Sequence, residues 1–166
     1  GGLSDLAKES VTNISAVVKK LTGKDIQDYD LHVQFPGTHN VDGDSASITM
    51  ATAIISAFEG VPIDQNLAMT GSLSVRGEVL PIGGVSAKIE AAVKSGIERV
   101  IIPRSNLQDV LIDEKYESMV EVLPVDSLDE VLQHALVGAE EKVTLVERLA
   151  SVIDTISSGA DTQPSA

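Results

Sequence analysis

A short polar motif, Gly43-Asp44-Ser45, stands at the predicted start of a helix and could supply a nucleophile. The first turn of a helix has unpaired N–H groups and the positive end of the helix dipole, which together can stabilise an oxyanion. Gly43 allows the backbone turn that would aim these groups. Asp and Ser are also common helix caps, and from spacing alone capping is the more frequent role. The motif makes Ser45 a candidate nucleophile and leaves both roles open.

A serine nucleophile needs a general base, and Lys88 differs in position from the other lysines. It lies on the shoulder of an apolar helical stripe that contains Val85, Ile89, Ala92 and Val93. To act as a base near neutral pH, its pKa must fall well below that of an ordinary lysine, which requires a largely apolar site. A lysine on such a shoulder more often extends its ammonium group into water, so the pattern alone leaves this role open as well.

The three histidines are weaker candidates for the base. His134 falls on the polar side of a predicted helix over residues 127–137, where it should face water. His39 lies in the polar loop that precedes Ser45, and His32 lies on the polar face of a predicted strand. A Ser-His hydrolase that uses His39 or His134 is therefore one alternative to a lysine base.

Templates for metal and phosphate sites do not fit the polar loop or the glycines. An EF-hand loop with Gly43 at its sixth position would have threonines at the first and last ligand positions. Asp42, Asp44 and His39 could in principle hold a hard cation, although a solvated acidic loop is the simpler interpretation. The glycines spell neither a P-loop nor a dinucleotide-binding fingerprint, so we expect no ATP site in this chain.

Alternating strands and helices must position these residues. Hydrophobic periodicity predicts helices over 4–22, 45–59, 85–95, 106–112, 127–137 and 140–156, and strands over 29–35, 66–75, 77–80, 98–102 and 120–125. The second and third strands form a β-hairpin, and the later ones form parallel βαβ units. The expected class is α+β with a mixed sheet. Residues 1–137 would form one domain, 138–156 a C-terminal helix and 157–166 a flexible tail.

Length and composition exclude several classes of function. With 166 residues, 43% of them hydrophobic, the chain can bury a core without disulfides or a structural metal. A formal charge of −13 and only four aromatic residues argue against nucleic-acid binding. The chain contains no cysteine, which leaves its redox compartment open. It has no apolar stretch long enough to span a bilayer and no secretory signal, so a cytoplasmic location is the default and we expect no membrane contact from this segment.

Five segments resemble the proteolytic domain of Lon proteases in order and spacing. The match covers about residues 2–137, and its segments are Asp30-Leu-His-Val-Gln-Phe-Pro-Gly, Asp42-Gly-Asp-Ser-Ala-Ser, Met69-Thr-Gly-Ser-Leu-Ser-Val-Arg-Gly-Glu-Val-Leu-Pro-Ile-Gly-Gly, Lys88 and Val100-Ile-Ile-Pro. Lon peptidases use a Ser-Lys dyad, so the resemblance implies that Ser45 is the nucleophile and Lys88 the base. It also implies that Thr70 orients the lysine, with Asp42, Gly43 and Asp44 supporting the site.

Two positions are similar to the archaeal B-type branch of this family. Asp44 and Ser47 stand where bacterial members carry proline and glycine. A carboxylate next to the nucleophile could pair with Lys88 and keep it protonated, which is the wrong state for a base. We hypothesise that Asp44 can clamp Lys88 in an inactive arrangement that assembly or substrate releases.

The resemblance implies a serine endopeptidase domain of an ATP-dependent protease, which cleaves unfolded polypeptides through an acyl-enzyme and works as a homo-hexameric ring. The AAA+ module, which would use ATP and Mg²⁺, and the strands that open the family's domain would be missing from this chain, so we expect no cofactor in this domain. Archaeal members are anchored to the cytoplasmic face of the membrane through their ATPase part. The alternative is a non-catalytic peptide-binding or assembly module in which Ser45 is only a cap.

Overall fold

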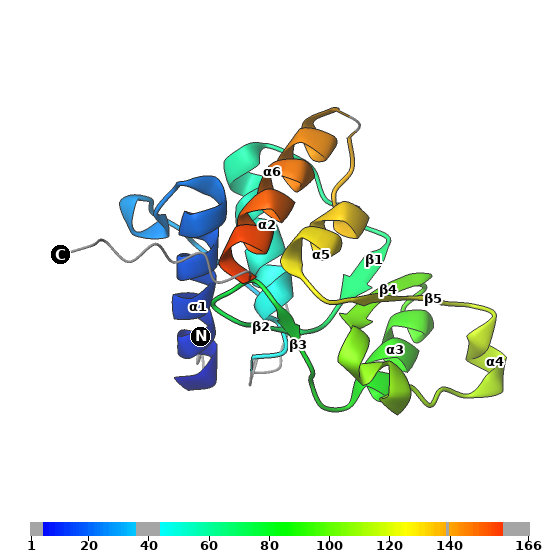
Figure 1. Ribbon diagram of the computed structural model, residues 1–166. Coiled ribbons are helices and arrows are strands. Elements are labelled where there is room, and N and C mark those ends of the chain that lie inside the picture. The colour runs from blue at the N-terminus through cyan, green and yellow to red at the C-terminus, as the bar shows by residue number, and fades with distance from the viewer. Residues whose placement is uncertain (1–4, 36–43, 139, 158–166) are drawn as a thin grey trace.

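The computed structural model describes residues 5–35, 44–138 and 140–157, which form helices around two small sheets (Figure 1). In chain order the elements are α1 (Asp5–Thr22), η1 (Ile26–Asp28), α2 (Ser47–Glu59), β1 (Leu67–Met69), β2 (Ser72–Leu73), β3 (Val79–Leu80), α3 (Val85–Lys94), β4 (Arg99–Pro103), η2 (Arg104–Asp109), α4 (Glu114–Glu117), β5 (Glu121–Val125), α5 (Leu128–Ala135) and α6 (Glu140–Ser157). The elements η1 and η2 are 3₁₀ helices. The predicted α+β class is confirmed.

A parallel sheet with the strand order β1-β4-β5 lies between two apolar layers. Residues alternate between its faces, as the pleat of a strand requires. Ile101 on β4 packs into a core formed mainly by α1, α2, α5 and α6, whereas its neighbours Val100 and Ile102 pack against α3. Parallel strands covered on both faces read as continuous apolar runs, which explains the sequence of β4. Figure 1 shows the four helices of the larger core grouped on one side of the sheet, and α3 and α4 at the other end.

The predicted hairpin forms, but the long strand expected over 66–75 is divided. Its first part, β1, pairs with β4 in the parallel sheet, and its second part, β2, pairs with β3 in a separate antiparallel sheet. The chain leaves the parallel sheet at Thr70 and Gly71 in order to approach α2. Gly71 donates its N–H to the carbonyl of Ser45 at 2.8 Å and accepts a bond from the N–H of Ile48 at 3.3 Å. Hydrophobic alternation continues through this change of partner, so it could not reveal the break.

Residues 29–35 do not form the expected strand. The segment follows η1, with Leu31 and Phe35 half-buried against the larger core and Val33 exposed. A strand needs a hydrogen-bonded neighbour, and no described strand lies alongside this segment. The prediction of a strand was wrong here because alternation reports which side chains are buried and does not report whether a partner is present.

The other predicted helices and strands are present with shifted ends, and the predicted tail beyond residue 157 lies outside the described residues. Helix α2 begins two residues later than expected, the short helix after β4 is a 3₁₀ helix that begins at Arg104, and the single-turn helix α4 was not expected. The last helix, α6, is part of the fold, because Leu145, Leu149 and Ile153 are buried in the larger core.

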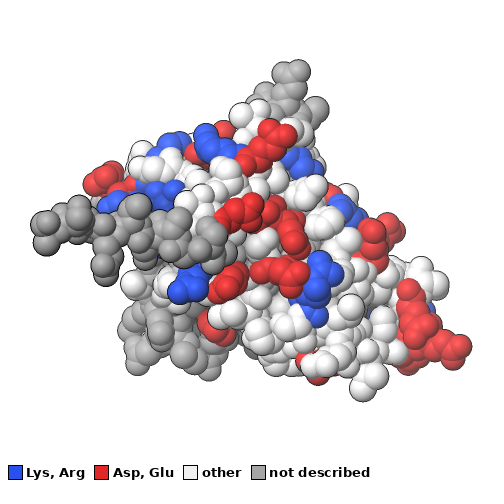
Figure 2. Space-filling model, in the orientation of Figure 1, with Lys and Arg blue, Asp and Glu red and all other residues white. Residues whose placement is uncertain are grey.

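Charged side chains lie mostly at the surface. Figure 2 shows acidic groups gathered near the middle of one face, with basic groups beside them. Several of these charges form exposed ion pairs, such as Arg104 with Asp126 and Arg148 with Glu59. Exposed pairs of this kind contribute little to stability. Within the described ranges, no helix is both long and apolar enough to cross a bilayer.

Candidate active site

Ser45 lies in the turn that leads into α2, and its hydroxyl does not cap the helix. The N-cap position is Ala46, and no side chain caps the N–H groups there. The turn is closed instead by Ser47, whose N–H and hydroxyl both donate to the carbonyl of Asp44. The capping role considered for Asp44 and Ser45 is therefore not what the structure shows, and the Ser45 hydroxyl is available for another partner.

That partner is Lys88. Its Nζ donates to Ser45 Oγ at 2.9 Å and to Thr70 Oγ1 at 3.2 Å. The predicted stripe of α3 is buried, so Lys88 leaves the helix at the edge of the apolar surface with a partly buried side chain. Lys94, on the far side of α3, is exposed and pairs with Glu90 at 3.3 Å. The two lysines of one helix thus have different environments, and Lys88 lies at the edge of the apolar stripe as predicted.

Burial lowers the pKa of Lys88 below its ordinary value, because the ammonium form loses hydration. The negative charge of Asp44 acts in the opposite direction and raises the pKa of Lys88, but burial is the larger effect. A lysine with a lowered pKa beside a serine hydroxyl has the electrostatics of a general base.

Thr70 links the side chain of Lys88 to the backbone of Ser45. Its side chain is only 6% exposed, and its backbone N–H is held by the carbonyl of Ile101 on β4 at 3.1 Å. Its hydroxyl accepts the bond from Lys88 and lies 3.3 Å from the carbonyl oxygen of Ser45, to which it donates. A single hydroxyl therefore fixes the amine of Lys88 relative to the backbone of the serine.

Asp44 points to a different partner from the one hypothesised. Its carboxylate accepts a hydrogen bond from the Ser72 hydroxyl at 2.6 Å. Among the described residues, Lys88 Nζ bonds Ser45 and Thr70 and forms no ion pair with Asp44. The clamped arrangement is thus not the one seen in this structure. Two further site residues of the sequence analysis, Asp42 and Gly43, lie outside the described residues.

Two hollows share Ser45 and Lys88 among their lining residues. A cleft of about 440 Å³ is lined by Asp44, Ser45 and Lys88 together with residues 81–83. A second, mainly apolar cavity of about 330 Å³ is lined by Phe35, Met69 and Val100, among others, and shares Ser45 and Lys88 with the cleft. The paired groups therefore face space that an extended ligand could enter.

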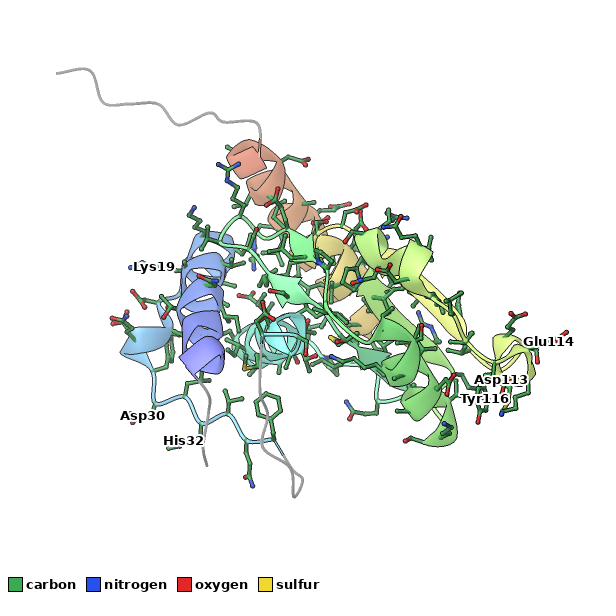
Figure 3. The ribbon with its side chains drawn as sticks, turned by 90° about the horizontal axis from the view of Figure 1, so that it is seen from below. Lys19, Asp30, His32, Asp113, Glu114 and Tyr116 are labelled. Carbon is green, nitrogen blue, oxygen red and sulfur yellow. The ribbon has the colours of Figure 1, made fainter. Side chains whose placement is uncertain are left out.

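Neither described histidine lines the two hollows at Ser45. His134 is half-buried on α5, where burial and then the charge of Arg99 lower its pKa, so the expectation that it faces water is only partly met. Figure 3 shows His32 on the segment after η1, near α1 and far from Asp113 and Tyr116 at α4. His39 lies outside the described residues. Within the described ranges, no group of three or more His, Asp or Glu side chains could hold a metal ion.

Gly71 and Ser72 were not among the site residues proposed from sequence. A Cβ at Gly71 would lie 3.0 Å from Ile48 Cδ1 and 3.1 Å from Val79 Cγ1, so any larger residue would push these side chains aside where the segment approaches α2. Ser72 holds the carboxylate of Asp44. Glycine between apolar residues signals a close backbone approach, but nothing in the sequence indicates which element approaches it.

Residues 1–138 match the family described as the Lon protease (S16) C-terminal proteolytic domain. The chain belongs to this family, and the resemblance seen in its motifs is confirmed. It is 53% identical over 159 residues to the archaeal Lon protease of Methanothermobacter thermautotrophicus, covering 95% of this chain and 24% of that protein.

Two other relatives support membership of the same family. The archaeal Lon protease of Halobacterium salinarum is 56% identical over 154 residues, covering 92% of this chain and 22% of that protein. The Lon protease of Azorhizobium caulinodans is 36% identical over 159 residues, covering 91% of this chain and 19% of that protein. The chain thus spans about a quarter or less of the length of these relatives, and the greater identity to the archaeal proteins agrees with the sequence at Asp44 and Ser47.

Proposed function

We propose that this chain is the serine endopeptidase domain of an ATP-dependent Lon-type protease, with Ser45 as nucleophile and Lys88 as general base. The observation that supports this most directly is the 2.9 Å contact between Lys88 Nζ and Ser45 Oγ, made by a lysine whose pKa is lowered by burial. An amine and a hydroxyl at this distance can exchange a proton without rearrangement. Family membership supports the reaction class independently.

The reaction follows from these contacts. Neutral Lys88 takes the proton of the Ser45 hydroxyl as Oγ attacks the peptide carbonyl carbon and the carbonyl π electrons move to oxygen. When the tetrahedral intermediate collapses, the C–N bond breaks, and protonated Lys88 gives its proton to the leaving amine. Lys88 then takes a proton from a water that attacks the acyl carbon, the ester C–O bond to Ser45 breaks, and Lys88 returns the proton to Ser45 Oγ as the new carboxyl group leaves. Thr70 keeps the amine aligned through both steps, because its hydroxyl bonds Lys88 and the Ser45 carbonyl.

Backbone N–H groups at the start of α2 would hold the oxyanion. The N–H groups of Ser47 and Ile48 are already bonded, to Asp44 and to Gly71. Those of Ser45 and Ala46 have no acceptor among the described residues, so they are the donors that we assign to the oxyanion. This refines the general expectation that the first helical turn supplies them.

The rest of the assignment concerns the whole protein, of which this chain corresponds to a part. We propose that its substrates are unfolded polypeptides, delivered by an AAA+ module of the same protein that uses ATP and Mg²⁺. We further propose a homo-hexameric ring and a cytoplasmic active site. The names of the relatives support the protease class, and the finer statements need separate tests.

The dyad is tested by Ser45→Ala and Lys88→Ala, with Lys94→Ala as the matched control on the same helix. Each dyad variant should lose about 10³-fold or more in cleavage of an unfolded protein, because the two groups act as a unit. Lys94→Ala should retain the parent rate. The readouts are cleavage across pH and labelling of Ser45 by a serine-reactive phosphonate.

The alternative, a non-catalytic binding module, predicts no labelling and no cleavage by the parent chain at any pH. A rate in Lys88→Ala equal to that of the parent would refute the lysine base. Double substitution of His39 and His134 by alanine should leave cleavage unchanged, and loss of cleavage there would instead favour a Ser-His enzyme.

A further inference from the structure

Residues 81–83 of the loop 81–84, between β3 and α3, form the part of the cleft wall that Asp44, Ser45 and Lys88 do not. The loop belongs to neither sheet, so no strand ladder fixes its backbone. Its last residue, Gly84, is also the N-cap of α3 and accepts a bond from the N–H of Lys88 at 3.2 Å. The shape of the cleft therefore depends on whatever holds this loop in place.

The side chain of Asn106, on η2, holds the loop from the far side. Its Oδ1 accepts the N–H of Ile82 at 2.8 Å, and its Nδ2 donates to the carbonyl of the same residue at 3.0 Å. One amide thus binds both backbone groups of Ile82, as a neighbouring strand would. Asn106 is 3% exposed, so water cannot replace these bonds easily if the side chain is removed.

The orientation of this amide is fixed by a third contact. Nδ2 also donates to the carboxylate of Asp109 at 2.9 Å, and a carboxylate can only accept. A flipped amide would place two acceptors together there and would lose both bonds to Ile82. The set of Asp109, Asn106 and Ile82 is therefore compatible with a single arrangement.

The element that carries Asn106 is itself anchored to the sheet and to α3. Helix η2 continues directly from β4, which is buried in the middle of the parallel sheet. Ser86, in the first turn of α3, donates its hydroxyl to the carbonyl of Asp109 at 3.0 Å and accepts the N–H of Leu111 at 2.8 Å. The wall of the cleft is thus tied to the same rigid body that positions Thr70.

We propose that Asn106 is a positioning residue for substrate binding: it fixes the backbone of Ile82 so that the loop 81–83 forms the wall against which an extended peptide lies beside Ser45. Asn106 does not reach the reacting atoms and acts only through the loop. The proposal rests on the proposed peptidase function. It adds a buried residue, outside the dyad, whose loss should affect the binding of extended peptides more than the chemistry of Ser45.

The test compares Asn106→Ala and the milder Asp109→Ala with the parent and with Asn66→Ala, a control that removes the same amide at an exposed position. Asn106→Ala should raise KM for an extended fluorogenic peptide about tenfold or more, because small misplacements of binding groups are costly. Asp109→Ala changes an exposed residue and should raise KM less. It replaces Asn106→Ala as the test variant if Asn106→Ala folds poorly. Labelling of Ser45 by a small fluorophosphonate, which does not need the wall, should keep the parent rate.

Amide hydrogen exchange at residues 81–84, measured by mass spectrometry, reads the loop independently of activity and should be faster in both variants. An unchanged KM in both, or a fluorophosphonate rate that falls as much as peptide cleavage, overturns the positioning role. Parent chain that neither cleaves peptide nor reacts with the phosphonate refutes the peptidase function instead. In that case the exchange measurement still decides whether Asn106 holds the loop, and unchanged exchange in both variants would refute that as well.

Discussion

Substitution of Thr70 by valine isolates the hydroxyl that links Lys88 to the serine backbone. Valine has nearly the same shape, so the buried site should keep its packing while losing two hydrogen bonds, at 3.2 Å to Lys88 and at 3.3 Å to the Ser45 carbonyl. A net contribution of about 1 kcal/mol for each bond gives a loss of about 2 kcal/mol. If that loss falls entirely on the transition state, it lowers kcat by about 30-fold. KM should stay near the parent value, because the shape of the adjoining cavity is retained.

The assay is steady-state cleavage of a fluorogenic peptide, with thermal unfolding measured in parallel. Thr52→Val is the matched control, because Thr52 is buried on α2 and its hydroxyl donates to the carbonyl of Ile48 at 2.7 Å, away from the dyad. It should lower the free energy of unfolding by about 1 kcal/mol and leave kcat unchanged. A kcat for Thr70→Val within about threefold of the parent would show that the amine needs no orienting group. An equal loss in both variants would show that the effect is structural.

Three further predictions use other features of the structure. Asp44→Asn removes the charge that raises the pKa of Lys88, so the rising limb of kcat/KM should move to lower pH; a limb that stays in place would contradict the electrostatic role of Asp44. Lys88→Met should be inactive but more stable than the parent at neutral pH in urea unfolding. Burial lowers the pKa of Lys88, so between that lowered pKa and the ordinary 10.5 the folded parent binds fewer protons than the unfolded chain. The stability of the parent therefore rises with pH in this window, and the stability advantage of Lys88→Met should shrink. A stability difference that stays constant with pH would be evidence against burial as the cause. Leu149→Ala should cost about 2–5 kcal/mol of unfolding free energy, because the side chain is fully buried in the core, whereas Val143→Ala on the same helix should cost little; equal small losses would place α6 outside the cooperative unit.

Much of the fold was predictable because the hydrophobic periodicity of each helix and strand is visible in a short stretch of sequence. The apolar stripe of α3 predicted both its buried face and the position of Lys88 at the edge of that face. The hairpin and the strand–helix alternation were predictable for the same reason. The wrong strand predictions at 29–35 and 66–75 share one cause. A strand forms only where it can pair with another strand, and a partner that is distant in the sequence cannot be recognised from the local pattern.

For the site, the sequence alone determined which residue types were present and on which side of each helix they lay. It excluded a cysteine nucleophile, since there is no cysteine, and the resemblance selected Ser45, Lys88 and Thr70. Only the tertiary structure decided that the Ser45 hydroxyl meets an amine instead of capping α2, and that Asp44 turns to Ser72. These contacts join residues far apart in the chain. Their distances depend on how the sheet, α2 and α3 pack together, which no local pattern encodes.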